Sequence, residues 1–138
     1  MKISEKGLEL IKTFEGCKLT AYRDSVGVLT IGYGHTRGVK EGDKITKKKA
    51  EDFLLEDLSN AERHVNGYLK KYRFKQNEYD ALVSFAFNIG SITQLTKNGK
   101  RSKGEIADKM LLYVKAGGKT LHGLVKRRKA ERDLFVYG

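Results

Sequence analysis

Apolar residues first recur with the period of a helix, from about residue 5 to residue 15. Ser4 precedes this segment as a candidate N-cap, and Gly16 follows it where a left-handed C′ glycine is common. Glu15 lies on the same helical face as Leu8. The pattern therefore predicts a short helix whose apolar face ends in a carboxylate.

The period then shortens to that of two β-strands, over residues 20–24 and 28–33. Three residues join them, and Gly27 is available for the left-handed position that such a hairpin loop requires. The stretch TIGYGHT, which begins in the second strand, contains two glycines that weaken a sheet. This interruption suggests that the segment has a role beyond strand pairing.

After residue 46 the apolar residues recur with the helical period only, in several separate segments. The segment 76–89 is apolar nearly all round, which is typical of a buried central helix. The polar segment 90–103 is expected to be a mobile linker. We expect four helices in this part of the chain, at 47–65, 76–89, from about 102 to 117, and 124–135. Thr46 is the candidate cap of the first. Ser102 and Glu105 form a capping box for the third, which is expected to end at Gly117 and Gly118.

This order of elements favours the α+β class. We expect a small N-terminal β lobe beside a larger helical lobe, with an active-site cleft between them. The length of 138 residues suggests one domain, which we place at 1–138. Cys17 is the only cysteine, so no internal disulfide can form, which fits a reducing cytoplasm.

The sequence has no run of about 18 apolar residues, so stable membrane insertion is not expected. Charges interrupt the apolar residues of its N-terminus, which argues against a secretory signal peptide. The formal net charge is +11. A surplus of this size predicts attraction to nucleic acid, anionic membranes or an acidic cell wall, and the alternative is a basic surface that only maintains solubility.

Two carboxylates, Glu15 and Asp24, lie close together in the sequence. With a three-residue hairpin loop Tyr22 faces Thr30, so Asp24 and Thr30 are diagonal neighbours on one face. A chain reversal near Lys18 could bring Glu15 over the same face. A carboxyl in an apolar setting and one in a wetter setting can act as the acid and the base of glycoside hydrolysis. The alternative is a helix-end residue and a turn-forming residue without catalytic roles.

Three separated segments carry a resemblance to a known family. They are FEG-x(5)-AYRD-x-x-G-x-x-TIGYGHT in the N-terminal third, ALVSFAFNIG at 81–90, and YVKAGGKTLHGLVKRRKAERDLF at 113–135. In this order they resemble the phage-type lysozymes, the endolysins with which phages lyse bacterial hosts. The resemblance implies a lysozyme-like fold and hydrolysis of the β-1,4 bond between N-acetylmuramic acid and N-acetylglucosamine in peptidoglycan.

Residue by residue, the resemblance places the catalytic acid at Glu15, the water-activating base at Asp24 and the water-positioning hydroxyl at Thr30. Members of the family generally work without a metal or cofactor, and we expect none here. Gly32 and Gly34 would let a sugar ring or a neighbouring backbone approach the strand, and a purely structural role is the alternative.

Further candidates for substrate binding, besides Gly32, are His35, Thr36 and Phe87. His35 is more often a structural histidine that ties a sheet to a helix, and Phe87 is equally suited to the core. Lys75 departs from the family pattern, because a capping Ser, Thr or Asn often precedes the central helix. Cys17 has no partner in the sequence that marks it as a nucleophile, so we interpret it as a passive small residue.

The stretch KRRKAER at 126–132 is interpreted first as a packed helix with i,i+3 and i,i+4 ion pairs, second as a wall-binding surface, and last as a nucleic-acid site. Two other functions compete with the hydrolytic muramidase: a lytic transglycosylase, and a non-enzymatic basic domain that binds the wall or nucleic acid. Asp24 and Thr30 argue against the transglycosylase, which needs no positioned water.

We expect a monomer that resides in the host cytoplasm and reaches the cell wall at lysis, through a membrane hole made by a separate holin. Its partner would be peptidoglycan glycan strands, with no nucleic acid.

Overall fold

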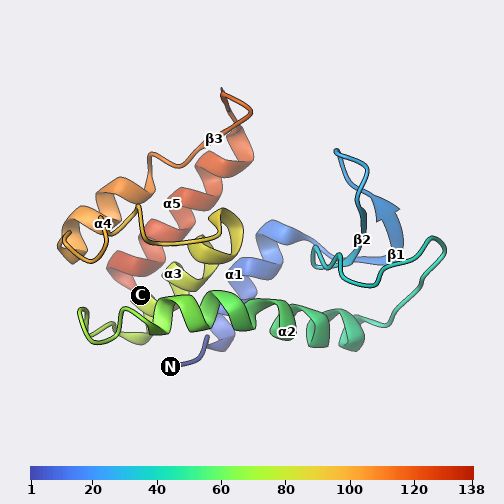
Figure 1. Cartoon of the computed structure of the whole chain (residues 1–138), viewed down its shortest axis with the longest axis horizontal. Coiled ribbons are helices and arrows are strands. Elements are labelled where there is room, and N and C mark those ends of the chain that lie inside the picture. The colour runs from blue at the N-terminus through green and yellow to red at the C-terminus, as the bar shows by residue number, and fades with distance from the viewer. The chain divides into compact units, whose positions relative to one another are not determined.

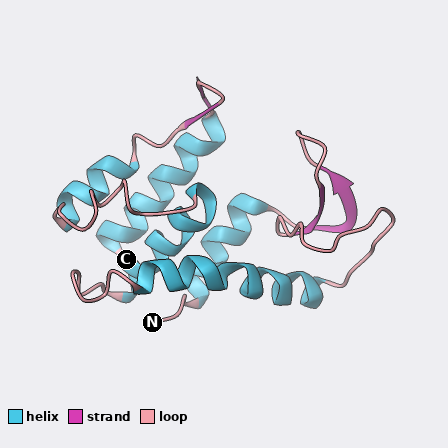
Figure 2. Ribbon diagram, in the orientation of Figure 1, coloured by secondary structure: helices cyan, strands magenta, loops and turns pink.

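The computed structural model describes all 138 residues, and it belongs to the predicted α+β class (Figures 1 and 2). Its helices are α1 (Glu5–Glu15), α2 (Lys47–Asn66), α3 (Gln76–Ile89), α4 (Lys103–Met110) and α5 (His122–Tyr137). Its strands are β1 (Lys18–Arg23), β2 (Leu29–Gly32), β3 (Lys115–Ala116) and β4 (Lys119–Thr120). None of the helices is both long and apolar enough to cross a membrane.

The chain forms two compact units, and the division falls within α1 and within α2. Residues 12–59 form the first, which we call the hairpin unit. Residues 1–11 and 60–138 form the second, which we call the helical unit. The helical unit is therefore assembled from two separate parts of the sequence.

The hairpin unit is built on the antiparallel pair β1 and β2. Tyr22 pairs with Thr30, as the expected register requires, and Gly27 has a φ of +85° in the connecting loop. The segment 43–45 pairs with the other edge of β1, through the amide of Ala21 and the carbonyl of Asp43 at 2.8 Å. This third, strand-like segment was not predicted.

The N-terminal half of α2 supplies three of the five buried apolar side chains of the hairpin unit. Thr46 caps the helix as predicted, because its hydroxyl accepts the amide of Lys49 at 3.1 Å. The residues buried in this half of the helix are Ala50, Leu54 and Leu58. Ile31 on β2 is buried as well, so the hairpin contributes to an apolar core.

In the helical unit α3 is the buried central helix, with the predicted boundaries, and α5 packs against it (Figure 1). Tyr79, Leu82 and Phe85 are among its fully buried side chains. The helix starts without a side-chain cap, as the lysine at 75 suggests. The Lys75 amide instead donates to the Glu78 carboxylate at 2.8 Å.

Ser4 does not cap α1 through its side chain, contrary to the prediction. Its hydroxyl donates to Asp80 Oδ2, and its amide donates to Asp80 Oδ1 at 3.0 Å. A Cβ on Gly7 would lie 2.8 Å from the Cβ of Asp80, so only glycine allows this close approach of α1 to α3. The carboxylate of α3 therefore replaces the expected local cap.

Two expectations for the second half of the chain are wrong. The third helix ends at Met110, and Gly117 and Gly118 form the turn of the small hairpin β3–β4. Both glycines have positive φ, which a two-residue hairpin turn requires as much as a helix C-terminus does. The expected linker is instead a compact series of turns with Ile92, Leu95 and Thr96 buried.

Candidate active site

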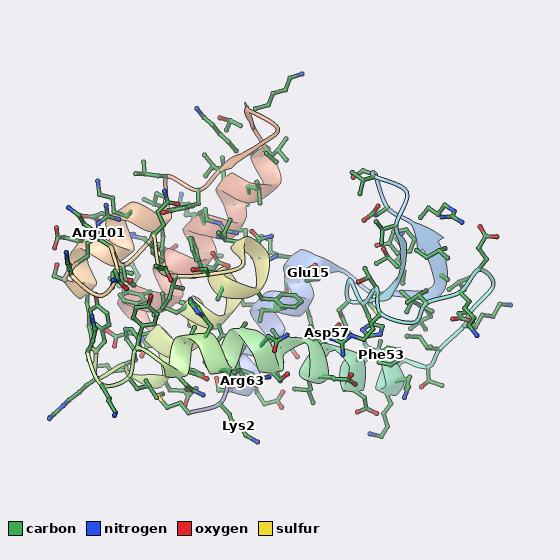
Figure 3. The ribbon with its side chains drawn as sticks, viewed as in Figure 1. Lys2, Glu15, Phe53, Asp57, Arg63 and Arg101 are labelled. Atoms are coloured by element: carbon green, nitrogen blue, oxygen red, sulfur yellow. The ribbon has the colours of Figure 1, made fainter.

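Glu15 is the last residue of α1 and belongs to the hairpin unit (Figure 3). Gly16 follows with a φ of +69°, and its amide donates to the carbonyl of Lys12 at 3.0 Å. This left-handed glycine ends the helix, as predicted. The helix terminus therefore fixes the backbone from which the half-buried Glu15 side chain extends.

A tight turn brings Gly34 next to the Glu15 carboxylate. Ile31 and His35 exchange two backbone hydrogen bonds of 2.9 Å, which closes the turn that contains Gly34. A Cβ built on Gly34 would lie 3.2 Å from Glu15 Oε1, and no other atom would lie within 4 Å of it. Glycine at this position thus leaves room for the carboxylate.

Asp24 uses one of its two carboxylate oxygens to shape the hairpin loop. Oδ1 accepts the amides of Val26 at 3.0 Å and Val28 at 2.9 Å. The Asp24 amide in turn donates to the carbonyl of Val28 at 3.0 Å. The side chain is therefore fixed through Oδ1, whereas Oδ2 makes no hydrogen bond within the chain and Asp24 is only half-buried.

Thr30 is linked to Asp24 through the peptide groups of the same loop. Its hydroxyl donates to the carbonyl of Val28 at 2.9 Å, and this carbonyl also accepts the Asp24 amide. Because the hydroxyl hydrogen is used in this bond, the lone pairs of Oγ1 remain to accept a hydrogen bond. The main chain of Val28 thus orients both predicted water-handling residues.

Gly32 and His35 make contacts that hold the turn against α2. A Cβ on Gly32 would lie 3.3 Å from the Cβ of Ala50, so the glycine gives room for the helix. His35 is buried, and its Nδ1 atom lies 2.8 Å from Asp57 Oδ2. Its ring stacks on the ring of Phe53, with the ring centroids 4.0 Å apart. Figure 3 shows both partners on α2. These contacts favour the structural alternatives for Gly32 and His35.

Thr36 and Phe87 are the remaining sequence candidates for substrate binding, and they lie in different units. Thr36 is exposed directly after the turn. Phe87 is half-buried on α3 and belongs to the helical unit. Cys17 is an exposed free thiol beside Tyr33, where burial raises the pKa of the tyrosine and the hydrogen-bonded Cys17 adds to the rise. No three carboxylate, imidazole or thiol groups of the chain are arranged to hold a metal ion.

The basic stretch at 126–132 lies on α5 and forms the predicted ion pairs. Glu131 Oε2 lies 3.2 Å from Arg127 Nε, and Glu131 Oε1 lies 3.1 Å from Arg128 Nη1. Ser84 on α3 donates to Glu131 at 2.5 Å, and the Arg128 guanidinium lies over the Phe85 ring. All three charged side chains are buried, so the packed, ion-paired interpretation is confirmed.

The sequence missed two contributors to the site, Val28 and Asp57, and for a third, Gly34, it missed the group that lies beside it. Val28 acts only through its main chain, so its residue type gives no signal. Gly34 was singled out as a point of close approach, but the Glu15 carboxylate was not identified as the group that approaches. Asp57 lies 22 positions from His35, and nothing local to either residue marks the pair.

A comparison with known families decides the identity of the chain. Residues 12–131 match the family model described as phage lysozyme. The chain belongs to the phage lysozyme family. It is 42% identical to an endolysin of Acyrthosiphon pisum secondary endosymbiont phage 1, with 98% of both chains covered, and 40% identical to an endolysin of Salmonella phage P22, with 99% of both covered.

Solved structures agree with this assignment. The muramidase domain of SpmX from Asticaccaulis excentricus is 36% identical, superimposes with a TM-score of 0.87, and is matched over 99% of both chains. The lysozyme-like fold and the class of enzyme are therefore established. This chain is a glycoside hydrolase of the lysozyme, or muramidase, type.

Proposed function

We propose that this endolysin hydrolyses the β-1,4 bond between N-acetylmuramic acid and N-acetylglucosamine in peptidoglycan. Glu15 donates a proton to the leaving oxygen of the glycosidic bond. Asp24 accepts a proton from the attacking water, and Thr30 orients that water. The hydrogen-bond arrangement around Val28 is the observation that supports the roles of Asp24 and Thr30.

That arrangement leaves two acceptors for one water molecule. Asp24 Oδ2 makes no bond within the chain, and the Thr30 hydroxyl has its hydrogen directed at the Val28 carbonyl. A water that donates one hydrogen to each has its oxygen lone pair free to attack the anomeric carbon. A hydroxyl is useful in this position only if a water must be oriented, which favours hydrolysis.

The biological setting follows from the proposed activity. Cleavage of the glycan strands by the enzyme would lyse the host cell. Release from the host cytoplasm through a separate holin, and action as a monomer, stay predictions. The proposed partner is the glycan strand, and nucleic acid and stable membrane insertion are not part of the proposal.

Purified peptidoglycan and mass spectrometry of the released fragments test the reaction. Hydrolysis adds one water to each cleaved bond, so we expect products with a free reducing end. Products that lack this water and carry an anhydro sugar would identify a lytic transglycosylase and remove the roles proposed for Asp24 and Thr30.

A further inference from the structure

The positive charge of this protein is concentrated in one of its two units. The helical unit contains 19 of the 28 basic residues and nine of the 17 acidic residues, and it therefore carries +10 of the net +11. The hairpin unit, with the proposed catalytic residues, is close to neutral. The surplus of positive charge therefore lies in the helical unit, and the chemistry of the proposed catalytic residues does not explain it.

Two segments of the helical unit contain a large part of this surplus. Residues 67–75 and 97–103 include no acidic residue. Their eight basic residues are Lys70, Lys71, Arg73, Lys75, Lys97, Lys100, Arg101 and Lys103. Only Lys103 is ion-paired, to Glu78 at 2.8 Å. We call these two segments together the basic loop surface.

Hydrogen bonds join the two segments into one surface. Lys71 Nζ donates to the Asn98 carbonyl at 3.1 Å, and Lys103 Nζ donates to the Arg73 carbonyl at 2.9 Å. The Tyr72 hydroxyl donates to the Arg101 carbonyl at 2.6 Å. The surface is therefore fixed by the fold, which reduces the entropy that a binding partner must overcome.

A pocket adjoins this surface at Arg101, a residue that Figure 3 labels. It has a volume of about 270 Å³ and is lined by Gln94, Arg101, Lys109, Leu112 and Tyr113. Arg101 is held there by a hydrogen bond from Nη1 to the Leu95 carbonyl at 3.0 Å. A guanidinium, an ammonium and an amide around one cavity can bind a phosphate group.

We propose that the basic loop surface docks a phosphodiester polymer of the bacterial wall, a polyol-phosphate chain, and so holds the enzyme at its substrate. Repeated unpaired cations match a polymer with one negative charge in each repeat. The two segments contain three aromatic residues, Tyr68, Tyr72 and Phe74. Tyr72 and Phe74 are buried, and Tyr68 is half-buried with its hydroxyl bonded to Thr93, so the surface offers no row of exposed rings to stack on bases, which disfavours nucleic acid. The docking role rests on the proposed action at the wall.

Two triple variants, which change the net charge of the protein by the same amount, test whether the basic loop surface is the binding site. The first, Lys70→Glu, Lys97→Glu and Lys100→Glu, alters exposed side chains of the basic loop surface that make no hydrogen bond. The matched control, Lys115→Glu, Lys119→Glu and Lys129→Glu, alters exposed lysines elsewhere in the helical unit. Binding is measured on walls with their phosphodiester polymers and on the same walls after acid removes these polymers, at about 150 mM salt.

We expect the wild type and the control variant to prefer the untreated walls. The first variant should bind untreated walls about tenfold more weakly and lose the preference. Equal binding of the wild type to both walls would overturn the proposal and indicate the carboxylates of peptidoglycan itself. Equal weakening of both variants would show that only total charge matters, and would also overturn it.

Competition with soluble polymers distinguishes a polyol-phosphate polymer of the wall from nucleic acid as the partner. Poly(glycerol phosphate) should release the wild type from untreated walls. A DNA duplex that does so while poly(glycerol phosphate) does not would replace the proposal with a nucleic-acid surface. Cleavage of a short neutral oligosaccharide should be the same for all three proteins, and its absence in the wild type would count against the proposed function without affecting the binding result.

Discussion

At the scale of single residues, the arrangement of the proposed catalytic residues depends on backbone groups as much as on side chains. The main chain of Val28 holds Asp24 Oδ1 through its amide and the Thr30 hydroxyl through its carbonyl. Any residue with a normal backbone could supply these bonds. The sequence identified the three catalytic candidates through the family resemblance, whereas the group that aligns two of them has no signature in the sequence.

Glu15→Gln should fold normally and lose nearly all lytic activity. The amide keeps the shape of the side chain but cannot donate the required proton. The unfolding temperature and the rate of cell lysis are measured on the same preparation. Lytic activity within about threefold of wild type would contradict the assignment of Glu15 as the acid.

Gly34→Ala should lower activity by about tenfold to a hundredfold, because the new Cβ would displace the Glu15 carboxylate. Gly38→Ala is the matched control, since Gly38 also has a positive φ but no neighbour within 4 Å of its Cβ. Both variants should lose about 1–2 kcal/mol of stability from the left-handed backbone. If activity falls equally in both, the backbone and not the contact with Glu15 is responsible.

The stereochemistry of the product tests Asp24. If a water lies between Asp24 and the sugar, the configuration inverts, and a β-linked substrate gives an α-anomeric reducing end. Proton NMR of the first products, recorded before mutarotation, measures this. An initial β-anomer, or a glycosyl adduct trapped on Asp24, would make Asp24 the nucleophile and would show that the role of Thr30 is wrong.

At the scale of elements, the helices with an uninterrupted apolar pattern were predicted well. The boundaries of α3 are those expected, and α2 extends one residue further than predicted. The end of α4 was predicted wrongly because Gly117 and Gly118 satisfy either a helix terminus or a hairpin turn. The pairing of residues 43–45 with β1 and the bond of Ser4 to Asp80 are long-range contacts, which a local pattern cannot reveal.

The buried network that joins α5 to α3 should be important for stability. Glu131→Gln leaves Arg128 buried without the carboxylate that it pairs with, so we expect a loss of about 3–5 kcal/mol in the free energy of unfolding. Asp133→Asn on the same helix is the control, because Asp133 pairs with Arg132 at a partly exposed site. That variant should lose less than about 1 kcal/mol in urea denaturation. Similar losses in both would mean that the network contributes little.

At the scale of the whole molecule, the uneven charge predicts how salt affects activity. Lysis of whole cells should weaken steeply between about 50 and 200 mM salt, because the attraction of the +11 protein to an anionic wall is screened. Cleavage of a short, neutral chito-oligomer, followed by product release, should respond much less. Equal sensitivity of the two substrates to salt would show that the charge does not act through the wall.

The discontinuity of the helical unit also determines the order in which the protein can fold during synthesis. Residues 1–11 leave the ribosome before the rest of the helical unit, and Asp80, the partner of Ser4, follows 76 positions after Ser4. The packing of α3 is in turn incomplete until α5 has been synthesised. The hairpin unit, by contrast, is continuous and emerges whole. A ribosome-bound chain therefore carries all three proposed catalytic residues well before its helical core can close.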